Sequence, residues 1–412
     1  MAPAAHASLA TGVPVYALAF IDEDHVVYVG GGGAGRSGVA NVVNVAQLEA
    51  QDPTPTIRAV GSLALSSQED APMCVDVDPS HGHIVCGINA PAAQMQAGTN
   101  DHVRVYSYEA HEGQVRMQPT SAVPSLALTD PEHYQKTCTL SLDRRLLAVA
   151  STDGRVQLHR YPSLEPVFSP QSGVLSLGEE VYGTDFSHDG KLLAITLASR
   201  IVLLSTTPRT LENGTTSFLP RIVQTIAQPQ IGSGLQGTFR VARFGRGPIY
   251  EGARTHALYA LLHAPAMRGS KARPSYVAMW DTETWTLKSS RAVSQRPATA
   301  LAVSPNGRLL AVGASDLHLT ILRAMTLQPL HQVRHAHDFP PTCLAFSPQS
   351  RVLVSGSADA TVRMTVLPPN LLPSHRTFVR YLHAVISDEL IFAAFFVLVL
   401  LMALLIPYFV HE

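Results

Sequence analysis

Apolar and polar positions alternate in short blocks along most of the chain, and the same block recurs. Each block contains an apolar strand, a Ser-Pro-Asn-Gly-like turn, a second apolar strand, a small-residue turn and an alternating third strand. Short apolar runs bounded by turn residues predict β-strands. The clearest copies are 299-TALAVSPNGRLLAVGASDLHLTILRA-324, 342-TCLAFSPQSRVLVSGSADATVRMTVL-367, 137-TCTLSLDRRLLAVASTDGRVQLHRY-161 and 182-YGTDFSHDGKLLAITLASRIVLLST-206.

Three weaker copies bring the number of blocks to seven. They lie at residues 14–33, 73–110 and 235–285. A single small sheet cannot bury both of its faces, whereas seven sheets arranged radially can. The predicted fold class is therefore all-β, a seven-bladed WD-type β-propeller, with few helices. The segment before Val13 is expected to supply the missing outer strand of the last blade.

A different pattern appears near the C-terminus. Residues 390–410 carry no charged side chain, and as a helix they would span about 31 Å, which matches a bilayer core of about 30 Å. Arg376 and Arg380 precede this stretch, so the positive-inside rule places the propeller in the cytosol. The predicted domains are a cytosolic propeller at 1–369, a juxtamembrane linker at 370–389, a single transmembrane helix at 390–410 and a lumenal tail at 411–412.

Composition narrows the function classes. The chain has 412 residues with 15% charged residues and a formal net charge of −1, and no long basic run, so no nucleic-acid partner is expected. The sequence has no HExxH and no GxSxG motif, which argues against metalloprotease and hydrolase chemistry. The four cysteines contain no CxxC pair and are interpreted as buried free thiols: Cys74, Cys86, Cys138 and Cys343.

Several residues resemble catalytic or metal-binding residues, yet a structural role is favoured for them. His337 lies just before a strand and Asp359 sits in a tight turn, where a His and an Asp of WD-type blades hold the turns by hydrogen bonds. Trp280-Asp281 resembles the WD dipeptide that ends a third strand. A metal site at His331, His335, His337 and Asp338 is disfavoured, because no further ligand lies nearby in sequence.

The most unusual segment is the glycine loop, defined as Gly30 to Asn41, within 28-YVGGGGAGRSGVANVVNV-45. Ordering glycine costs more backbone entropy than ordering any other residue, so the loop is either floppy or shaped for backbone contacts. Its 33-GAGRSG-38 matches GxGxxG, but a dinucleotide site needs a following helix. The alternation in 39-VANVVNVAQL-48 predicts a strand instead, so the loop is expected to join strands two and three of the first blade.

An ordered glycine loop can expose either amides or carbonyls. Converging amides would form an anion nest, and converging carbonyls would bind a hard cation. No carboxylate occurs from Gly30 to Asn41, so a carbonyl cage would suit a monovalent cation better than a divalent one.

Four glycines, a short insertion and then Gly38-Val39-Ala40-Asn41, in the first blade of a propeller with one C-terminal anchor, resemble a known family. This is the prolactin regulatory element-binding protein family, the endoplasmic-reticulum exchange factors for the small COPII GTPase. The resemblance covers residues 1–410. One departure is Ala40, where some relatives have Pro, and another is the minimal tail after Val410.

The resemblance implies a guanine nucleotide exchange factor that starts COPII coat assembly, in the endoplasmic reticulum membrane. Exchange needs no nucleophile or base and no nucleotide cofactor, and a rigid loop with one polar tip would suffice. A potassium ion held by backbone oxygens would keep the loop rigid. Asn41, Val39 and Gly38 would carry the exchange activity, and the other loop residues would bind the GTPase: Gly30, Gly31, Gly32, Gly33, Ala34, Gly35, Arg36, Ser37 and Ala40.

Two alternatives remain open from the sequence. One is a tail-anchored propeller scaffold without exchange activity, since propellers are mostly interaction platforms. The other is an enzyme with a bound nucleotide cofactor.

Overall fold

In the computed structural model the chain divides into two compact units, residues 1–367 and 368–412. The structure describes residues 5–371 except 36, 52–53, 169–173, 211–215, 218, 233, 250–252, 254, 267–271 and 369–370. The predicted span 390–410, the tail 411–412 and nearly all of the linker 370–389 lie outside the described residues. Among the residues that are described, no helix has the length and apolar character needed to cross a membrane.

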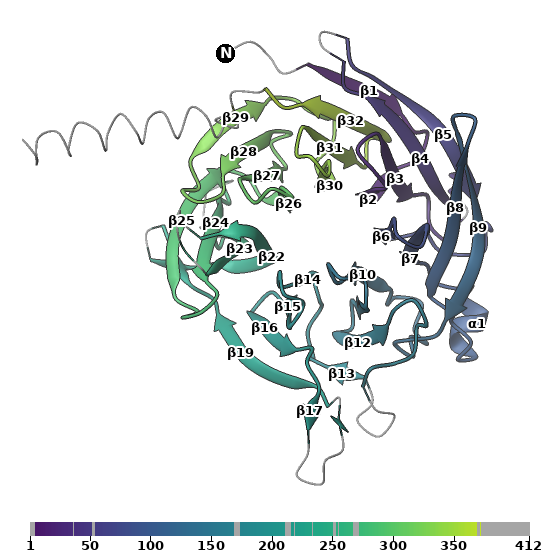
Figure 1. Cartoon of the computed structure of the whole chain (residues 1–412), viewed down its shortest axis with the longest axis horizontal. Coiled ribbons are helices and arrows are strands. Elements are labelled where there is room, and N and C mark those ends of the chain that lie inside the picture. The colour runs from purple at the N-terminus through teal and green to yellow at the C-terminus, as the bar shows by residue number, and fades with distance from the viewer. Residues whose placement is uncertain are drawn as a thin grey trace, which may run out of the picture. The chain divides into compact units, whose positions relative to one another are not determined.

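The first unit is a ring of seven four-stranded antiparallel sheets around a central opening (Figure 1), as the repeat predicts. In six blades the strands follow chain order from the centre outward. These blades are β2–β5 (Val15–Phe20, His25–Gly30, Val42–Glu49, Thr56–Ala64); β6–β9 (Cys74–Asp78, His83–Gly87, Val103–His111, Gln114–Val123); β10–β13 (Gln135–Leu140, Leu146–Ser151, Arg155–Arg160, Leu175–Ser176); β14, β15, β16 and β19 (Gly183–Phe186, Leu192–Thr196, Arg200–Ser205, Arg221–Ala227); β22–β25 (Thr238–Pro248, His256–His263, Ser275–Asp281, Leu287–Ser294); and β26–β29 (Ala298–Val303, Leu309–Ala314, Leu319–Arg323, Pro329–Val333).

The seventh blade is built from both ends of the unit. It contains β30 (Pro341–Phe346), β31 (Val352–Ser357) and β32 (Thr361–Val366), and β1 (His6–Ala10) is its outer strand. The expectation that the segment before Val13 closes the ring is confirmed. The remaining described elements are short: α1 (Ala92–Gln96), β17 (Arg209–Thr210), β18 (Thr216–Ser217), β20 (Gln230–Ile231) and β21 (Leu235–Gln236).

A serine hydroxyl organises the turn between the first two strands of several blades. In the sixth blade the Ser304 hydroxyl donates to Asn306 Oδ1 at 2.7 Å and accepts from the Leu309 amide at 2.9 Å. Ser187 makes the equivalent bonds with Asp189 and the Leu192 amide. Such side chains offer the backbone a local hydrogen-bond partner in place of the sheet ladder, so the strand ends there.

The core lies between neighbouring blades. Val27 and Val45 of the first blade pack with Val77 and Ile84 of the second in one buried cluster. Burying each such side chain stabilises the fold by about 1.5–3 kcal/mol, and the equivalent cluster between the seventh and first blades contains Tyr28 and Met364.

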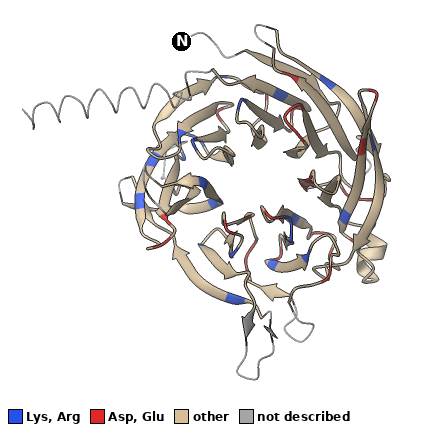
Figure 2. Ribbon diagram, viewed as in Figure 1, with Lys and Arg blue, Asp and Glu red and all other residues tan. Residues whose placement is uncertain are grey.

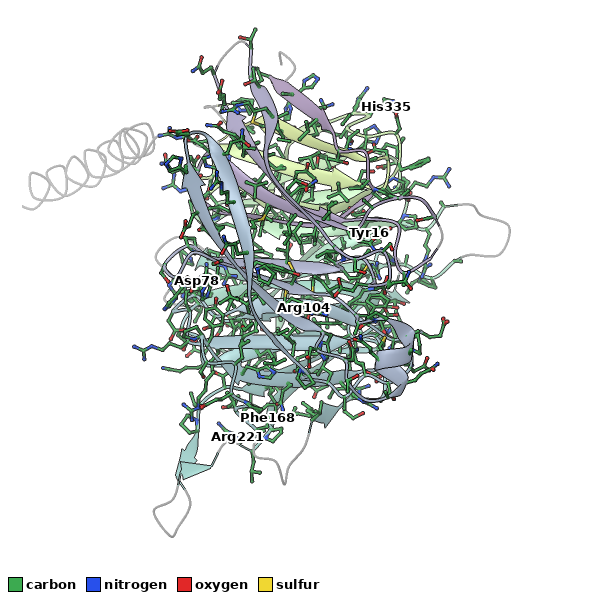
Figure 3. The ribbon with its side chains drawn as sticks, turned by 90° about the vertical axis from the view of Figure 1, so that its right-hand side faces the viewer. Tyr16, Asp78, Arg104, Phe168, Arg221 and His335 are labelled. Atoms are coloured by element: carbon green, nitrogen blue, oxygen red, sulfur yellow. The ribbon has the colours of Figure 1, made fainter. Side chains whose placement is uncertain are left out.

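Two rims follow from the common direction of the inner strands. The rim where the inner strands begin, here called the loop rim, carries the blade-to-blade connections and the loops between second and third strands. Figure 3 shows Tyr16 and His335 on this rim, whereas Asp78, which ends an inner strand, lies at the opposite rim.

The architectural roles of His337 and Asp359 are confirmed. The buried His337 ring lies 2.8 Å from the Thr361 hydroxyl and 2.7 Å from the Ser355 hydroxyl, and Asp359 accepts from the Thr361 hydroxyl and the Asp338 amide. Trp280-Asp281 ends β24 as expected. The cysteines are free, although Cys343 is only half-buried.

His102 is a second buried histidine that the sequence did not single out. Its Nδ1 donates to Gln135 Oε1 at 2.6 Å, and its Nε2 accepts from the Ser125 and Leu126 amides at 3.2 and 3.0 Å. Two amide donors on Nε2 fix the neutral tautomer, because protonation of that nitrogen would remove their acceptor. Burial lowers the pKa of His102 to about 4.

We predict that acid weakens the propeller through His102. Because the folded pKa lies below the unfolded value, the unfolded state binds the proton more readily, and stability falls as pH drops from about 6.5 to about 4. The expected loss between pH 7 and pH 4.5 is about 2 kcal/mol. Denaturant unfolding at pH 7 and pH 4.5 measures this loss. The free energy of unfolding of His102→Gln should differ less between the two pH values than that of the wild type. An equal difference in the variant and the wild type would show that His102 is not the cause.

Candidate functional site: the glycine loop

The glycine loop joins β3 to β4 in the first blade, on the loop rim. The segment after it forms strand β4, paired with β3 from Gly30↔Val42 to His25↔Gln47. The prediction of a long strand-two-to-three connection is therefore confirmed. A dinucleotide site would need a helix at this position, so the structure agrees with the rejection of that motif.

Asn41 anchors the loop rather than forming its tip. The side chain is 2% exposed. Its Oδ1 accepts from the Gly33 amide at 2.9 Å, and its Nδ2 donates to the carbonyls of Gly33 and Glu69 at 3.1 and 2.9 Å. The Asn41 side chain therefore acts at the base of the loop, where its amide group makes three hydrogen bonds.

Close approach of other parts of the chain explains the first glycines. A Cβ on Gly30 would lie 1.8 Å from the Pro14 carbonyl oxygen, and a Cβ on Gly32 would lie 2.0 Å from Ser37 Oγ. Gly31 has φ +148°, and its Cβ would meet Asn41 Oδ1 at 2.2 Å. Side chains at these positions would push the loop away from its anchor. By contrast, a Cβ on Gly35 would meet nothing within 4 Å.

The outer part of the loop presents small side chains. The exposed residues are Ala34, Gly35, Ser37, Gly38 and Ala40, and Val39 is half-buried. The Ser37 hydroxyl accepts from the Val39 amide at 3.2 Å, and Gly38 has φ +73°. Arg36 lies outside the described residues. Apart from Arg36, the residues of this segment are small and lose little side-chain entropy on entering a narrow crevice of a partner.

Two supports of the loop come from elsewhere in the sequence, and no sequence motif indicated them. The Tyr16 hydroxyl donates to the Gly31 carbonyl at 3.0 Å, and burial raises the pKa of Tyr16, as does the nearby Asp70 carboxylate. Glu69 holds Asn41 through its backbone while its carboxylate pairs with Arg104 at 3.1 Å. The only sequence signal was position, since Tyr16 opens an inner strand and residues 66–71 connect two blades.

The structure also brings a carboxylate to the glycine loop. Asp70 Oδ1 lies 3.1 Å from the point that a Cβ on Gly33 would occupy, although the loop itself contains no acidic residue. Backbone carbonyls and one carboxylate are hard oxygen donors with little net negative charge. Oxygen donors of this kind are the type that hard cations prefer, although the Gly31 and Gly33 carbonyls already accept hydrogen bonds from Tyr16 and Asn41.

Fold and loop together define a WD-type propeller that projects an anchored, small-residue loop from its first blade. The family model described as WD domain, G-beta repeat matches residues 328–364. Over 353 residues the chain is 26% identical to the rat guanine nucleotide-exchange factor SEC12, covering 79% of each chain, and the mouse protein of that name matches to the same extent. It is 27% identical to SEC12 of Candida glabrata over 201 residues, 47% of this chain and 41% of that protein.

These similarities confirm the resemblance to SEC12-type exchange factors that the sequence indicated. The chain spans less than half the length of the Candida glabrata relative but most of the length of the two rodent relatives.

We predict that Gly31→Ala loosens the loop and that Gly35→Ala does not. The first change places a methyl group against Asn41 on a residue with positive φ, which costs about 1–3 kcal/mol. The methyl group of the second change enters open space. Hydrogen exchange of the peptide covering residues 31–41 should be about tenfold faster in Gly31→Ala. Equal exchange in both variants would show that the close approach does not hold the loop.

Proposed function

We propose that the protein is a guanine nucleotide exchange factor for a small GTPase, and that the glycine loop is the element that acts on the GTPase. The observation that carries the proposal is an ordered loop, pinned by the buried Asn41 amide, that projects small residues from the loop rim. The similarity to SEC12 exchange factors over 79% of the chain supports it.

Exchange follows from differential binding. A protein that binds the nucleotide-free GTPase more tightly than the loaded form weakens nucleotide binding by the same factor, through linkage. No covalent step is required of the propeller. A loop that is already ordered loses less of its binding free energy to ordering than a floppy one. Asn41 acts here by fixing the loop conformation, while Val39 and Gly38 lie in the part that meets the partner.

The finer proposals concern partner and location. The GTPase is the small COPII GTPase, and exchange starts coat assembly at the endoplasmic reticulum. Residues 390–410 anchor the chain in that membrane, with the propeller in the cytosol. The uncharged stretch supports the anchor, and the resemblance of the loop supports the partner.

Potassium is the cation proposed for the loop, held by loop carbonyls and the Asp70 carboxylate. When bound, the ion would neutralise these oxygens and stiffen the loop. The rest of the contribution comes from the chain itself: Asn41, Tyr16 and Glu69 hold the backbone in place.

The first test is nucleotide release. The full-length chain in non-ionic detergent is mixed with the small COPII GTPase loaded with a fluorescent GDP. We expect the wild type to accelerate release at least about tenfold, a barrier reduction of about 1.4 kcal/mol or more, and Asn41→Ala to lose most of this acceleration. Gln118→Ala, on an exposed position of β9, is the matched control and should behave as wild type.

Val39→Asp separates contact from loop order, since it leaves the Asn41 anchor in place and adds a charge to the contact surface. It should also slow release. If the wild type gives no acceleration while magnesium chelation still releases the GDP, the protein is a scaffold and the proposal is wrong.

A second test replaces potassium by lithium at constant ionic strength. The small lithium ion is a poor match for a carbonyl cage, so exchange should slow several-fold, and hydrogen exchange in residues 31–41 should quicken without any GTPase present. Identical behaviour in both salts would exclude a role for the cation.

A further inference from the structure

A cavity of about 260 Å³ opens at the loop-rim end of the central channel. This volume is many times what one water molecule needs, so the cavity suits a small ligand. Its wall contains Lys136, Arg240 and Arg243, and no aspartate or glutamate is among its lining residues. Figure 2 shows basic positions on β22, beside the central opening.

Two of the cations share one aromatic ring. The Arg240 guanidinium lies 4.7 Å from the centre of the Tyr182 ring, and the Lys136 ammonium lies 5.9 Å from it. Lys136 also pairs with Glu180 at 2.9 Å. Arg240 makes no ion pair among the residues described. Two like charges on one ring repel each other, and one carboxylate neutralises only one of them.

Arg243 adds a third positive charge lower in the same cavity. Its Nη1 donates to the carbonyls of Thr184 and Ala242 at 3.2 and 3.0 Å. Burial lowers its pKa, although Asp185 and Asp76 oppose the shift. These bonds hold the Arg243 guanidinium at the cavity wall. A bound anion there would compensate for part of the hydration that the guanidinium loses on burial.

The opposite end of the channel contains carboxylates. There a cavity of about 650 Å³ is lined by Asp76 and Asp185 as well as by Arg144, Arg243 and Arg246, and Arg246 pairs with Asp185 at 2.9 Å. Basic residues without any aspartate or glutamate therefore line the loop-rim cavity but not the opposite one, and Arg243 borders both.

We propose that this cavity is a binding site for a small phosphate-type oxyanion, a free phosphate or compact phosphate ester. Guanidinium groups match phosphate oxygens through forked hydrogen bonds, and a phosphate would balance the Arg240 charge, which has no ion-pair partner among the described residues, with Arg243 and Lys136 nearby. Tyr182 and Thr137 are lining residues of the same cavity. Tyr16 lines the cavity too and donates to Gly31, so the anion lies beside the glycine loop. The site does not depend on the proposed exchange activity.

Titration calorimetry with sodium pyrophosphate tests the site on the full-length chain in non-ionic detergent and a phosphate-free buffer at pH 7. We expect saturable binding to one site and a melting temperature that rises with pyrophosphate concentration. Arg240→Gln should weaken binding about tenfold or more, as expected for loss of a charged hydrogen bond. Arg291→Gln, the same charge change at an exposed position of β25, should bind as wild type.

Melting curves without ligand show whether each variant is folded, and Arg240→Gln should be no less stable than wild type because it removes the repulsion with Lys136. The proposal is overturned if the wild type shows no saturable binding at millimolar pyrophosphate. Equal affinities of Arg240→Gln and Arg291→Gln would also overturn it. Succinate is the carboxylate comparison, and binding as tight as that of pyrophosphate would contradict a phosphate site.

Discussion

Closure of the ring is the constraint on which the rest of this structure depends. Each blade buries its faces only against its neighbours, so the first blade needs the seventh. Strand β1 pairs with β32, the Thr342 hydroxyl donates to the Val15 carbonyl at 2.5 Å, and Glu23 accepts from the Ser347 hydroxyl at 2.8 Å. The glycine loop belongs to the blade at this junction, and the Pro14 carbonyl that receives the Gly31 amide lies one residue before β2. The loop is therefore held by the same region that closes the ring.

Much of the fold was predictable because local pattern and global architecture agree. The repeated turn residues, such as Ser304 with Asn306, mark the same strand boundaries in several blades, and the alternation after Gly38 indicated a strand correctly. The outer strands were harder to predict. β13 has only two residues and β29 begins at a proline, so neither has the long apolar alternation that identifies a strand.

The candidate site was only partly predictable. The glycines were conspicuous, and the structure explains Gly30, Gly31 and Gly32 by close contacts. The orientation of Asn41 could not be deduced, because its partners include Glu69, which lies 28 positions further along the chain. The same holds for Asp70 and Tyr16. Pattern reasoning sees neighbours in sequence, whereas this site is assembled from an inner strand, a blade-to-blade connection and a hairpin loop.

Because the seventh blade contains strands from both ends of the unit, it also limits when the ring can close during synthesis. During synthesis the first residues of the unit, His6–Ala10, have no sheet to join until Thr361–Val366 have been made. Six blades and their loops emerge before the ring can close. A ribosome-bound chain that stops short of the last blade therefore carries the complete glycine loop on a support that is still open, and any activity of this loop awaits nearly the whole of residues 1–367.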